Sequence, residues 1–231
     1  MATYCVNDIH GMYEKYLPLL DKIGFSDEDT LYIIGDLVDR GPKPMALLRD
    51  VMGRKSVVAL AGSHDLLAAM FLKKLIYGGG KEDLDEKAVM GIFLWRQDGG
   101  ASTLADFHKL SVSERQDIVD WLRELELYRE IEVGGETYVL VHAGLGQNAD
   151  PARVLDDYDL DAYLFERPNY DKEVYPDKYI VSGHAPTRLI PGNPNPDRIY
   201  RDNRHIAIDC GCVFGGKLGA ICMDTGEEYY V

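Results

Sequence analysis

The chain has 231 residues, 46% of them hydrophobic, so it can bury one sizeable core and we expect a single domain over residues 1–231. Its 25 lysines and arginines against 39 aspartates and glutamates give a formal net charge of −14. This balance argues against non-specific nucleic-acid binding and docking on an anionic membrane, because both need basic patches. A phosphorylated substrate stays compatible with it, because bound divalent cations can dominate the local charge of a site.

The amino-terminal segment 1–8 lacks the basic and apolar regions of a signal peptide, and no apolar run reaches the length of a membrane span. We therefore expect a cytoplasmic protein. The four cysteines lack the paired spacing of a zinc ribbon, which predicts buried free thiols in a reducing compartment. They are Cys5, Cys210, Cys212 and Cys222.

The first third of the chain predicts three strand–loop–helix units. The expected strands cover residues 3–6, 31–34 and 57–61. The expected helices cover residues 13–23, 45–52 and 66–77. Alternation of this kind indicates an α/β fold with a mostly parallel central sheet.

The second part of the chain is less regular. Residues 78–83 (GGGKED) predict a surface loop and not a phosphate cradle, because the Gly-Lys-Ser/Thr of a P-loop is absent. Trp95 and Trp121 are interpreted as core anchors. Helices are expected over residues 84–95 and 113–127, and strands over residues 138–141 and 179–181. The tail predicts antiparallel strands that are compatible with a second sheet, over residues 205–209, 220–223 and 228–231.

The stretch Gly35–Gly41 follows the second predicted strand and brings charged side chains to the point where this strand ends. Open α/β sheets bind their ligands at such strand ends. Asp36 is placed to bind a metal, and the planar guanidinium of Arg40 suits a phosphate. Taken alone, the stretch is also compatible with an ordinary strand-turn that carries a surface ion pair.

Five predicted strand ends carry groups that can bind divalent metals. They are Asp8 with His10, Asp36, Ser63 or its neighbours, His142, and His184. Four of the six histidines lie at these ends, counting His64, and core packing does not account for this placement. Carboxylate and imidazole ligands together suit Mn²⁺, Fe or Zn²⁺ better than a thiolate-binding metal. Asp36 is the natural bridge between two ions about 3.5–4 Å apart, which could activate a shared hydroxide for in-line displacement.

Five short motifs occur in an order that resembles a known family. They are Asp8-x-His10-Gly11, Gly35-Asp36-x-Val38-Asp39-Arg40-Gly41, Gly62-x-His64-Asp65, His142-Ala143-Gly144 and Gly183-His184. In these motifs the chain resembles the PPP-type metallophosphoesterases, and among them the bacterial and bacteriophage serine/threonine protein phosphatases. The resemblance implies the calcineurin-like fold, an α/β/β/α sandwich of two sheets flanked by helices, with the metals at the strand ends.

The resemblance also implies the ligands of two metal ions, with Mn²⁺ as the expected metal and Fe or Zn²⁺ as alternatives. One ion would be held by Asp8, His10 and Asp36. The other would be held by Asp36, His142, His184 and the residue at position 63.

The same resemblance implies the residues that carry out the reaction. His64 would be the general acid that protonates the leaving oxygen, oriented by Asp39. A carboxylate partner suits this role, because it fixes the imidazole tautomer and raises its pKa. Arg40 would bind the phosphoryl oxygens, and Arg167 resembles the second phosphate-binding arginine of the family.

Ser63 departs from the family motif, which has asparagine at this position. A serine hydroxyl is shorter than an asparagine side chain and a poorer neutral ligand than its carbonyl oxygen. We therefore expect the second site to bind metal more weakly than usual, so that activity requires added Mn²⁺.

The leading hypothesis is a hydrolase that cleaves phosphomonoesters by direct attack of a metal-bound hydroxide, with phosphoserine and phosphothreonine in proteins as substrates. One alternative is a symmetrical diadenosine tetraphosphate hydrolase. Asp39 argues against it, because that branch usually carries another residue there, and so does the short chain. A second alternative is a degenerate phosphate-binding member without turnover, which Ser63 alone favours.

Overall fold

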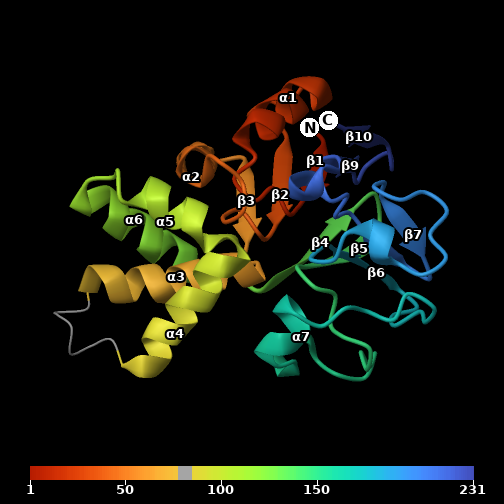
Figure 1. Cartoon of the computed structure of the whole chain (residues 1–231). Coiled ribbons are helices and arrows are strands. Elements are labelled where there is room, and N and C mark those ends of the chain that lie inside the picture. Colours follow the sequence, from red (N-terminus) through yellow and green to blue (C-terminus); the bar gives the residue numbers. More distant parts are fainter. Residues whose placement is uncertain (78–84) are drawn as a thin grey trace.

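The computed structural model describes residues 1–77 and 85–231, and the predicted loop at 78–83 lies outside them. Two five-stranded sheets form the centre (Figure 1). The first sheet has the order β10-β9-β1-β2-β3, in which β1, β2 and β3 are parallel and β9 and β10 antiparallel. Its strands are β1 (Thr3–Val6), β2 (Thr30–Ile34), β3 (Val57–Leu60), β9 (Gly219–Cys222) and β10 (Glu228–Tyr230).

The second sheet has the order β4-β5-β6-β8-β7. Its central strands β5, β6 and β8 are parallel, and β4 and β7 pair antiparallel at the two edges. The strands are β4 (Tyr128–Val133), β5 (Glu136–Val141), β6 (Lys178–Ser182), β7 (Tyr200–Asp202) and β8 (His205–Ala207).

Apolar side chains from both sheets meet in one buried cluster, so the sheets pack face to face. The cluster includes Cys5, Ile34 and Leu60 from the first sheet and Leu140, Val181 and Ile206 from the second. Aliphatic residues of this kind fill the space between two stacked sheets. The predicted two-sheet sandwich is confirmed, whereas the expectation of a single domain stays a prediction.

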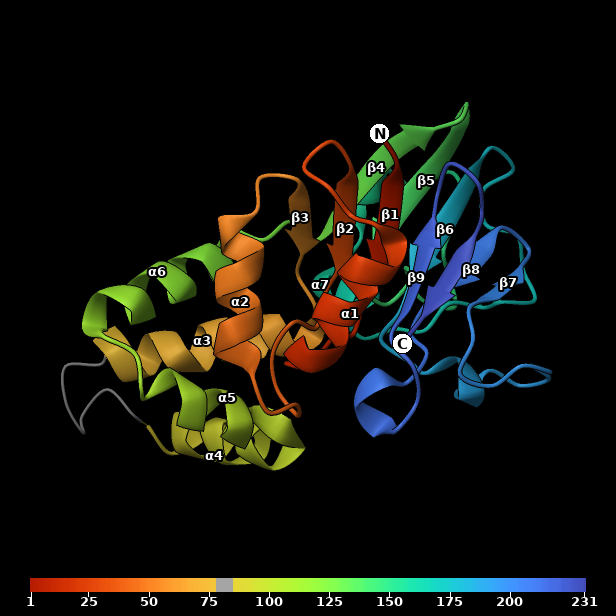
Figure 2. The same cartoon turned by 90° about the horizontal axis from the view of Figure 1, so that it is seen from above.

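Seven α-helices in the described residues flank the sheets. Helices α1 and α2 pack against the first sheet, and α3–α6 gather beyond its β3 edge, while α7 lies beside the second sheet (Figures 1 and 2). None of them is both long and apolar enough to span a bilayer. They are α1 (Tyr13–Ile23), α2 (Pro44–Gly53), α3 (Ser63–Tyr77), α4 (Glu86–Trp95), α5 (Ala101–Phe107), α6 (Val112–Arg123) and α7 (Leu160–Leu164).

The structure differs from the sequence-based elements in several places, and β4, β7, α5 and α7 have no counterpart in the prediction. Helix α3 begins at Ser63 and not at Leu66, because the chain turns into the helix directly after β3. Helix α6 ends at Arg123 and not at residue 127, since Glu126 instead forms a bridge with Leu60 of the first sheet. The tail strands do not form a sheet of their own: β8 joins β6 in parallel, and β9 and β10 return to the first sheet.

All four cysteines are buried and free, as predicted. Burial raises the pKa of the Cys5 and Cys210 thiols well above the ordinary cysteine value, so both stay protonated and unreactive near neutral pH. Trp95 is buried, in agreement with its interpretation as an anchor, whereas Trp121 is only partly buried.

Candidate active site

The loops that follow β1, β2, β5 and β6 lie side by side and are joined by backbone hydrogen bonds. The N–H of His10 donates to the carbonyl of Asp36 (2.8 Å), and the N–H of Gly183 donates to the carbonyl of His142 (2.8 Å). The N–H of His184 donates to the carboxylate of Asp8 (3.0 Å), which joins the β6 loop to the β1 loop. Segments far apart in the sequence therefore present their polar side chains at one place.

Asp36 lies at the centre of this arrangement. Its Oδ2 atom is 3.4 Å from Nε2 of His10 and 3.5 Å from Nε2 of His142. Among the described residues, the side chains that could hold a metal form two groups: His10, Asp36 and His64, and Asp36, His142 and His184. Asp36 belongs to both groups, as expected of a bridging ligand. Asp8 belongs to neither, although its Oδ1 lies 3.8 Å from Nε2 of His10.

The backbone is strained at six of the predicted site residues. Positive φ angles occur at Asp8 (48°), His10 (47°), Asp36 (54°), Asp39 (70°), Arg40 (66°) and His184 (65°). Each such residue costs on the order of 1–3 kcal/mol and persists only where the surrounding structure holds it. The hydrogen bonds between the loops provide this support. The strain turns these side chains toward one another instead of continuing the extended course of the strands.

The histidine tautomers are suited to binding metal through Nε2. Nδ1 of His10 lies 2.8 Å from the carbonyl oxygen of Val38, and Nδ1 of His142 lies 3.0 Å from that of Ile34. A carbonyl can only accept, so both Nδ1 atoms carry the proton and both Nε2 atoms keep a lone pair. Within the described part of the chain, Nε2 of His142 is buried without a hydrogen-bond partner. A role as a metal ligand explains why this nitrogen has no hydrogen-bond partner.

The charges at the site also fit divalent cations. Burial lowers the pKa of His10 and of His184 to about 4, so both imidazoles are neutral and able to ligate near pH 7. Burial, with Asp209 and Asp36 nearby, raises the pKa of Asp8 well above its usual range. Burial likewise raises the pKa of Asp209 to about 7. Buried carboxylates this close to one another need a compensating positive charge, which a bound cation would supply.

His64 and Asp39 form the pair that the resemblance implies. Nδ1 of His64 donates to Oδ2 of Asp39 (2.7 Å). Burial alone would lower the pKa of His64, but this hydrogen bond and the charge of Asp36 outweigh burial and raise it. This shift favours the protonated imidazole, which can donate its second proton from Nε2.

Sequence analysis missed two residues that orient Asp39. Trp95 donates its indole N–H to Oδ2 (2.7 Å), and the hydroxyl of Thr103 donates to Oδ1 (2.6 Å). Both side chains are buried, and they fix the carboxylate that in turn fixes His64. A signal for Trp95 exists in the sequence, because a buried indole N–H needs an acceptor, but nothing local identifies Asp39 as that acceptor.

Arg40 extends into the site from the loop after β2. Its Nη1 lies 2.7 Å from Nε2 of His10, and its Nη2 lies 3.5 Å from Oδ1 of Asp98. The guanidinium is partly buried, so its remaining donors can reach a phosphate at the cluster. Asp98, in the kinked segment Arg96–Gly100 between α4 and α5, also lies 3.6 Å from Nε2 of His64.

The two remaining predicted site residues lie at the margin of the cluster. Ser63 is buried as the first residue of α3, directly before His64, whose N–H donates to Oδ1 of Asp36 (2.9 Å). Its role as a ligand stays a prediction. Arg167 is exposed, and its charge contributes, after burial and His142, to lowering the pKa of His184. Its role in binding phosphate stays a prediction.

Several curated relatives share one name. The chain is 37% identical over 147 residues to a symmetrical bis(5'-nucleosyl)-tetraphosphatase of Acidovorax ebreus, a match that covers 63% of this chain and 44% of the relative. The matched part thus spans less than half the length of this relative. A protein of the same name from Aromatoleum aromaticum is 33% identical over 289 aligned positions, covering 100% of this chain and 97% of its own.

Solved structures agree in fold. A protein described as a candidate diadenosine tetraphosphatase superposes with a TM-score of 0.69 at 21% identity, covering 99% of this chain and 92% of its own. A serine/threonine phosphatase from Saccharomyces cerevisiae gives a TM-score of 0.61 at 16% identity, covering 98% and 73%. The family model of the calcineurin-like phosphoesterases matches residues 1–214. Because this family model covers most of the chain and the predicted fold is present, the chain belongs to the calcineurin-like phosphoesterases, a family of metal-dependent hydrolases.

Proposed function

We propose that the chain hydrolyses dinucleoside tetraphosphates at their central anhydride and releases two nucleoside diphosphates. The observation that carries this substrate is the match along the whole chain to a symmetrical bis(5'-nucleosyl)-tetraphosphatase at 33% identity. The comparisons thus favour the alternative from sequence analysis over the phosphoprotein substrate that was its first choice. The clustered carboxylates, imidazoles and arginine of the site provide the chemistry that either substrate needs.

The proposed ligand sets are those that the family resemblance implies; they share Asp36, as the two groups in the structure do, but the first set has Asp8 where the structural group has His64. Asp8, His10 and Asp36 would hold one ion. Asp36, His142 and His184 would hold the other, with Ser63 beside them. Mn²⁺ is the proposed metal, and two such ions would activate water and neutralise the charge of the reacting phosphate.

The residues of this chain bind the substrate and supply a proton. Arg40, with Arg167 as a second cation, binds the non-bridging phosphoryl oxygens. Water forms the new bond to one central phosphorus and loses a proton to solvent, and the bond from that phosphorus to the bridging oxygen breaks. Nε2 of His64 gives its proton to the departing oxygen, while Asp39 stabilises the imidazolium through the Nδ1 hydrogen bond.

The leaving group separates the two substrate classes. A nucleoside diphosphate is a weak base and leaves readily, whereas the alkoxide of serine needs a proton as the bond breaks. By Brønsted reasoning, His64→Ala should reduce kcat by about 100-fold or more for a phosphoserine peptide and by much less for a dinucleoside tetraphosphate.

The testing experiment incubates purified protein and Mn²⁺ with diadenosine tetraphosphate or a phosphoserine peptide and separates the products by chromatography. Two equivalents of ADP per substrate are expected, with kcat/KM at least tenfold above that for the peptide. An Asp36→Asn variant prepared in parallel controls for contaminating hydrolases. ATP plus AMP as products, or a preference for the peptide, would overturn the proposal.

A further inference from the structure

Two exposed phenylalanines lie beside the candidate active site, where no part of the proposed chemistry uses them. Phe214 is 53% exposed and Phe165 is 40% exposed. They come from distant segments, the turn Cys212–Phe214 before β9 and the end of α7. Isolated exposed apolar residues are common, so exposure alone does not indicate a role. Their positions relative to the site do.

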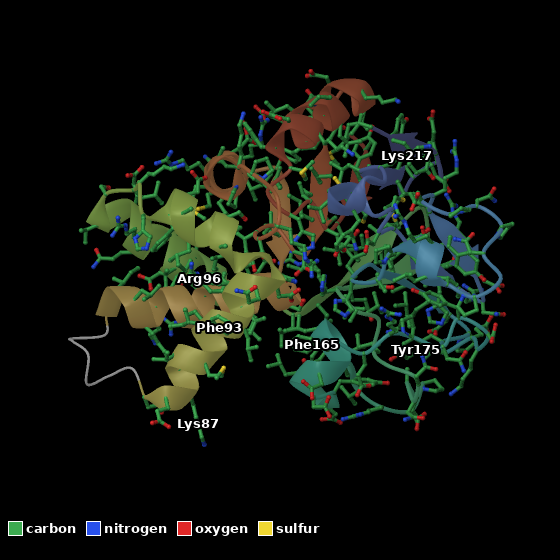
Figure 3. All side chains as sticks on the ribbon, in the orientation of Figure 1. Lys87, Phe93, Arg96, Phe165, Tyr175 and Lys217 are labelled. Carbon is green, nitrogen blue, oxygen red and sulfur yellow. The ribbon has the colours of Figure 1, made fainter. Side chains whose placement is uncertain are left out.

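Phe165 lies on the metal side of the site. Its ring centroid is 6.4 Å from that of His184, and the two rings are nearly perpendicular, at 89°. Phe165 directly follows Leu164, the last residue of α7, and Figure 3 shows it beside this helix in the central part of the molecule. Its N–H donates to the carbonyl of Asp161 (2.9 Å), so the backbone that carries the ring is held in place.

Phe214 lies on the arginine side of the site. Its ring is 5.1 Å from the central carbon of the Arg40 guanidinium, within the range of a cation–π contact. A tight turn carries this ring, since the N–H groups of Phe214 and Gly216 both donate to the carbonyl of Gly211 (2.9 Å each). The positive φ of Gly215 (81°) completes the turn. The ring is therefore held in an exposed position next to a phosphate-binding group.

We propose that Phe165 and Phe214 are stacking platforms for the two nucleobases of the substrate. This inference rests on the proposed function and deepens it. A dinucleoside tetraphosphate cut at its centre carries one base on each side of the reacting bond, at equal distances along the chain of phosphates. One exposed aromatic ring beside a metal ligand and another beside the phosphate-binding arginine match this arrangement. Stacking on aromatic rings accepts any base, because every base has a π-face.

The test measures binding, not turnover. Calorimetric titrations compare ADP with methyl diphosphate, which has the same charged group but no base, on the Mn²⁺-loaded protein. Wild type should bind ADP more tightly, and Phe214→Ala and Phe165→Ala should each weaken ADP binding by about 5- to 100-fold. Affinity for methyl diphosphate should stay within about twofold. Phe214→Trp should keep or improve ADP binding.

Phe93→Ala is the matched control. Phe93 is a third exposed phenylalanine, on α4 with Val89 and Met90, and it makes no described contact with the site residues. Its variant should bind both ligands as wild type does. Equal loss of ADP and methyl diphosphate in the Phe165 and Phe214 variants would overturn the inference, since the rings would then only support the site.

The inference and the proposed function fail in different ways. If diadenosine tetraphosphate is cleaved to ADP but the Phe165 and Phe214 variants bind ADP like Phe93→Ala, the stacking inference is wrong and the proposed function stands. If ADP binding depends on both rings but no dinucleotide is cleaved, the nucleobase site stands without that substrate. If the variants weaken only phosphopeptide binding, the surface serves peptides and the inference is overturned.

Discussion

Asp36 has imidazoles on two sides, with Oδ2 3.4 Å from His10 and 3.5 Å from His142, and its Oδ1 accepts the backbone N–H of His64. Burial would raise its pKa, but His142, His10 and His64 together hold that pKa well below the usual range. A single carboxylate thus stays charged and connects both candidate metal groups to the start of α3.

The proton on His64 gives a pH prediction. His64 must be protonated to act as the acid, and its pKa is raised above the ordinary histidine value. The kcat for an alkyl phosphomonoester should therefore fall as the pH rises through this pKa. Asp39→Asn removes the carboxylate that favours the imidazolium, and the alkaline limb of the pH–kcat profile should move to lower pH. An unshifted limb would show that another group is the acid.

Ser63 gives a second prediction at the scale of one residue. If position 63 contributes to the second metal set, Ser63→Asn adds a carbonyl ligand to it, and the Mn²⁺ concentration for half-maximal activity should fall by about tenfold, or ~1.4 kcal/mol. Metal titration of both proteins measures this effect directly. Two equally tight sites in the wild type would contradict it, and turnover only in the variant would identify the wild type as a degenerate member.

At the scale of elements, the site depends on how closely the turn from β3 to α3 approaches the loop after β2. A Cβ atom on Gly62 would lie 2.1 Å from the backbone nitrogen of Asp36 and 2.2 Å from its Oδ1. Real Cβ atoms do not come this close, so only glycine lets the two segments meet. The same contact places His64 within hydrogen-bond reach of Asp36.

Gly62→Ala should therefore destabilise the protein by about 2–4 kcal/mol and weaken metal binding. Gly53→Ala, near the end of α2, is the control, because a Cβ atom there meets nothing within 4 Å and the effect should stay within about 1 kcal/mol. Urea unfolding of the two variants and the wild type gives the comparison. Equal stability of the two variants would show that the turn can move aside.

At the scale of the whole molecule, a chain with a net charge of −14 buries carboxylates at the junction of its two sheets. Burial, together with Asp209 and Asp36, raises the pKa of Asp8, and burial together with Asp36 raises the pKa of Asp209. Burying these carboxylates costs free energy of folding, and divalent ions bound at the same place would offset that cost. Stability and metal binding should therefore be coupled.

Metal removal tests this coupling. Saturating Mn²⁺ should raise the melting temperature above that in a chelator, with about 2.7 kcal/mol of stabilisation at a metal concentration 100 times Kd. Asp36→Asn should lose most of this rise, because the residue belongs to both metal groups. Differential scanning calorimetry with and without Mn²⁺ gives the result, and a rise of the same size in the variant would place the ions elsewhere.

Residues next to one another in the sequence were sufficient to predict much of this protein. Strand ends followed by Asp8, His10, Asp36, His142 and His184 indicated where the site residues come together, because parallel strands end at the same edge. The α/β start of the chain and the burial of the cysteines followed from local pattern and composition in the same way.

Only the tertiary structure decided the rest. Trp95 and Thr103 reach Asp39 across 56 and 64 residues, and no local periodicity indicates such a pairing. The pairing partners of β8, β9 and β10 likewise depend on which sheet has a free edge once the other strands have paired. The local pattern of the tail could therefore not assign these strands to a sheet. The sequence assigns no role to the side chains of Phe165 and Phe214, which become neighbours of the site only when the chain folds, because burial and contact are properties of the folded chain.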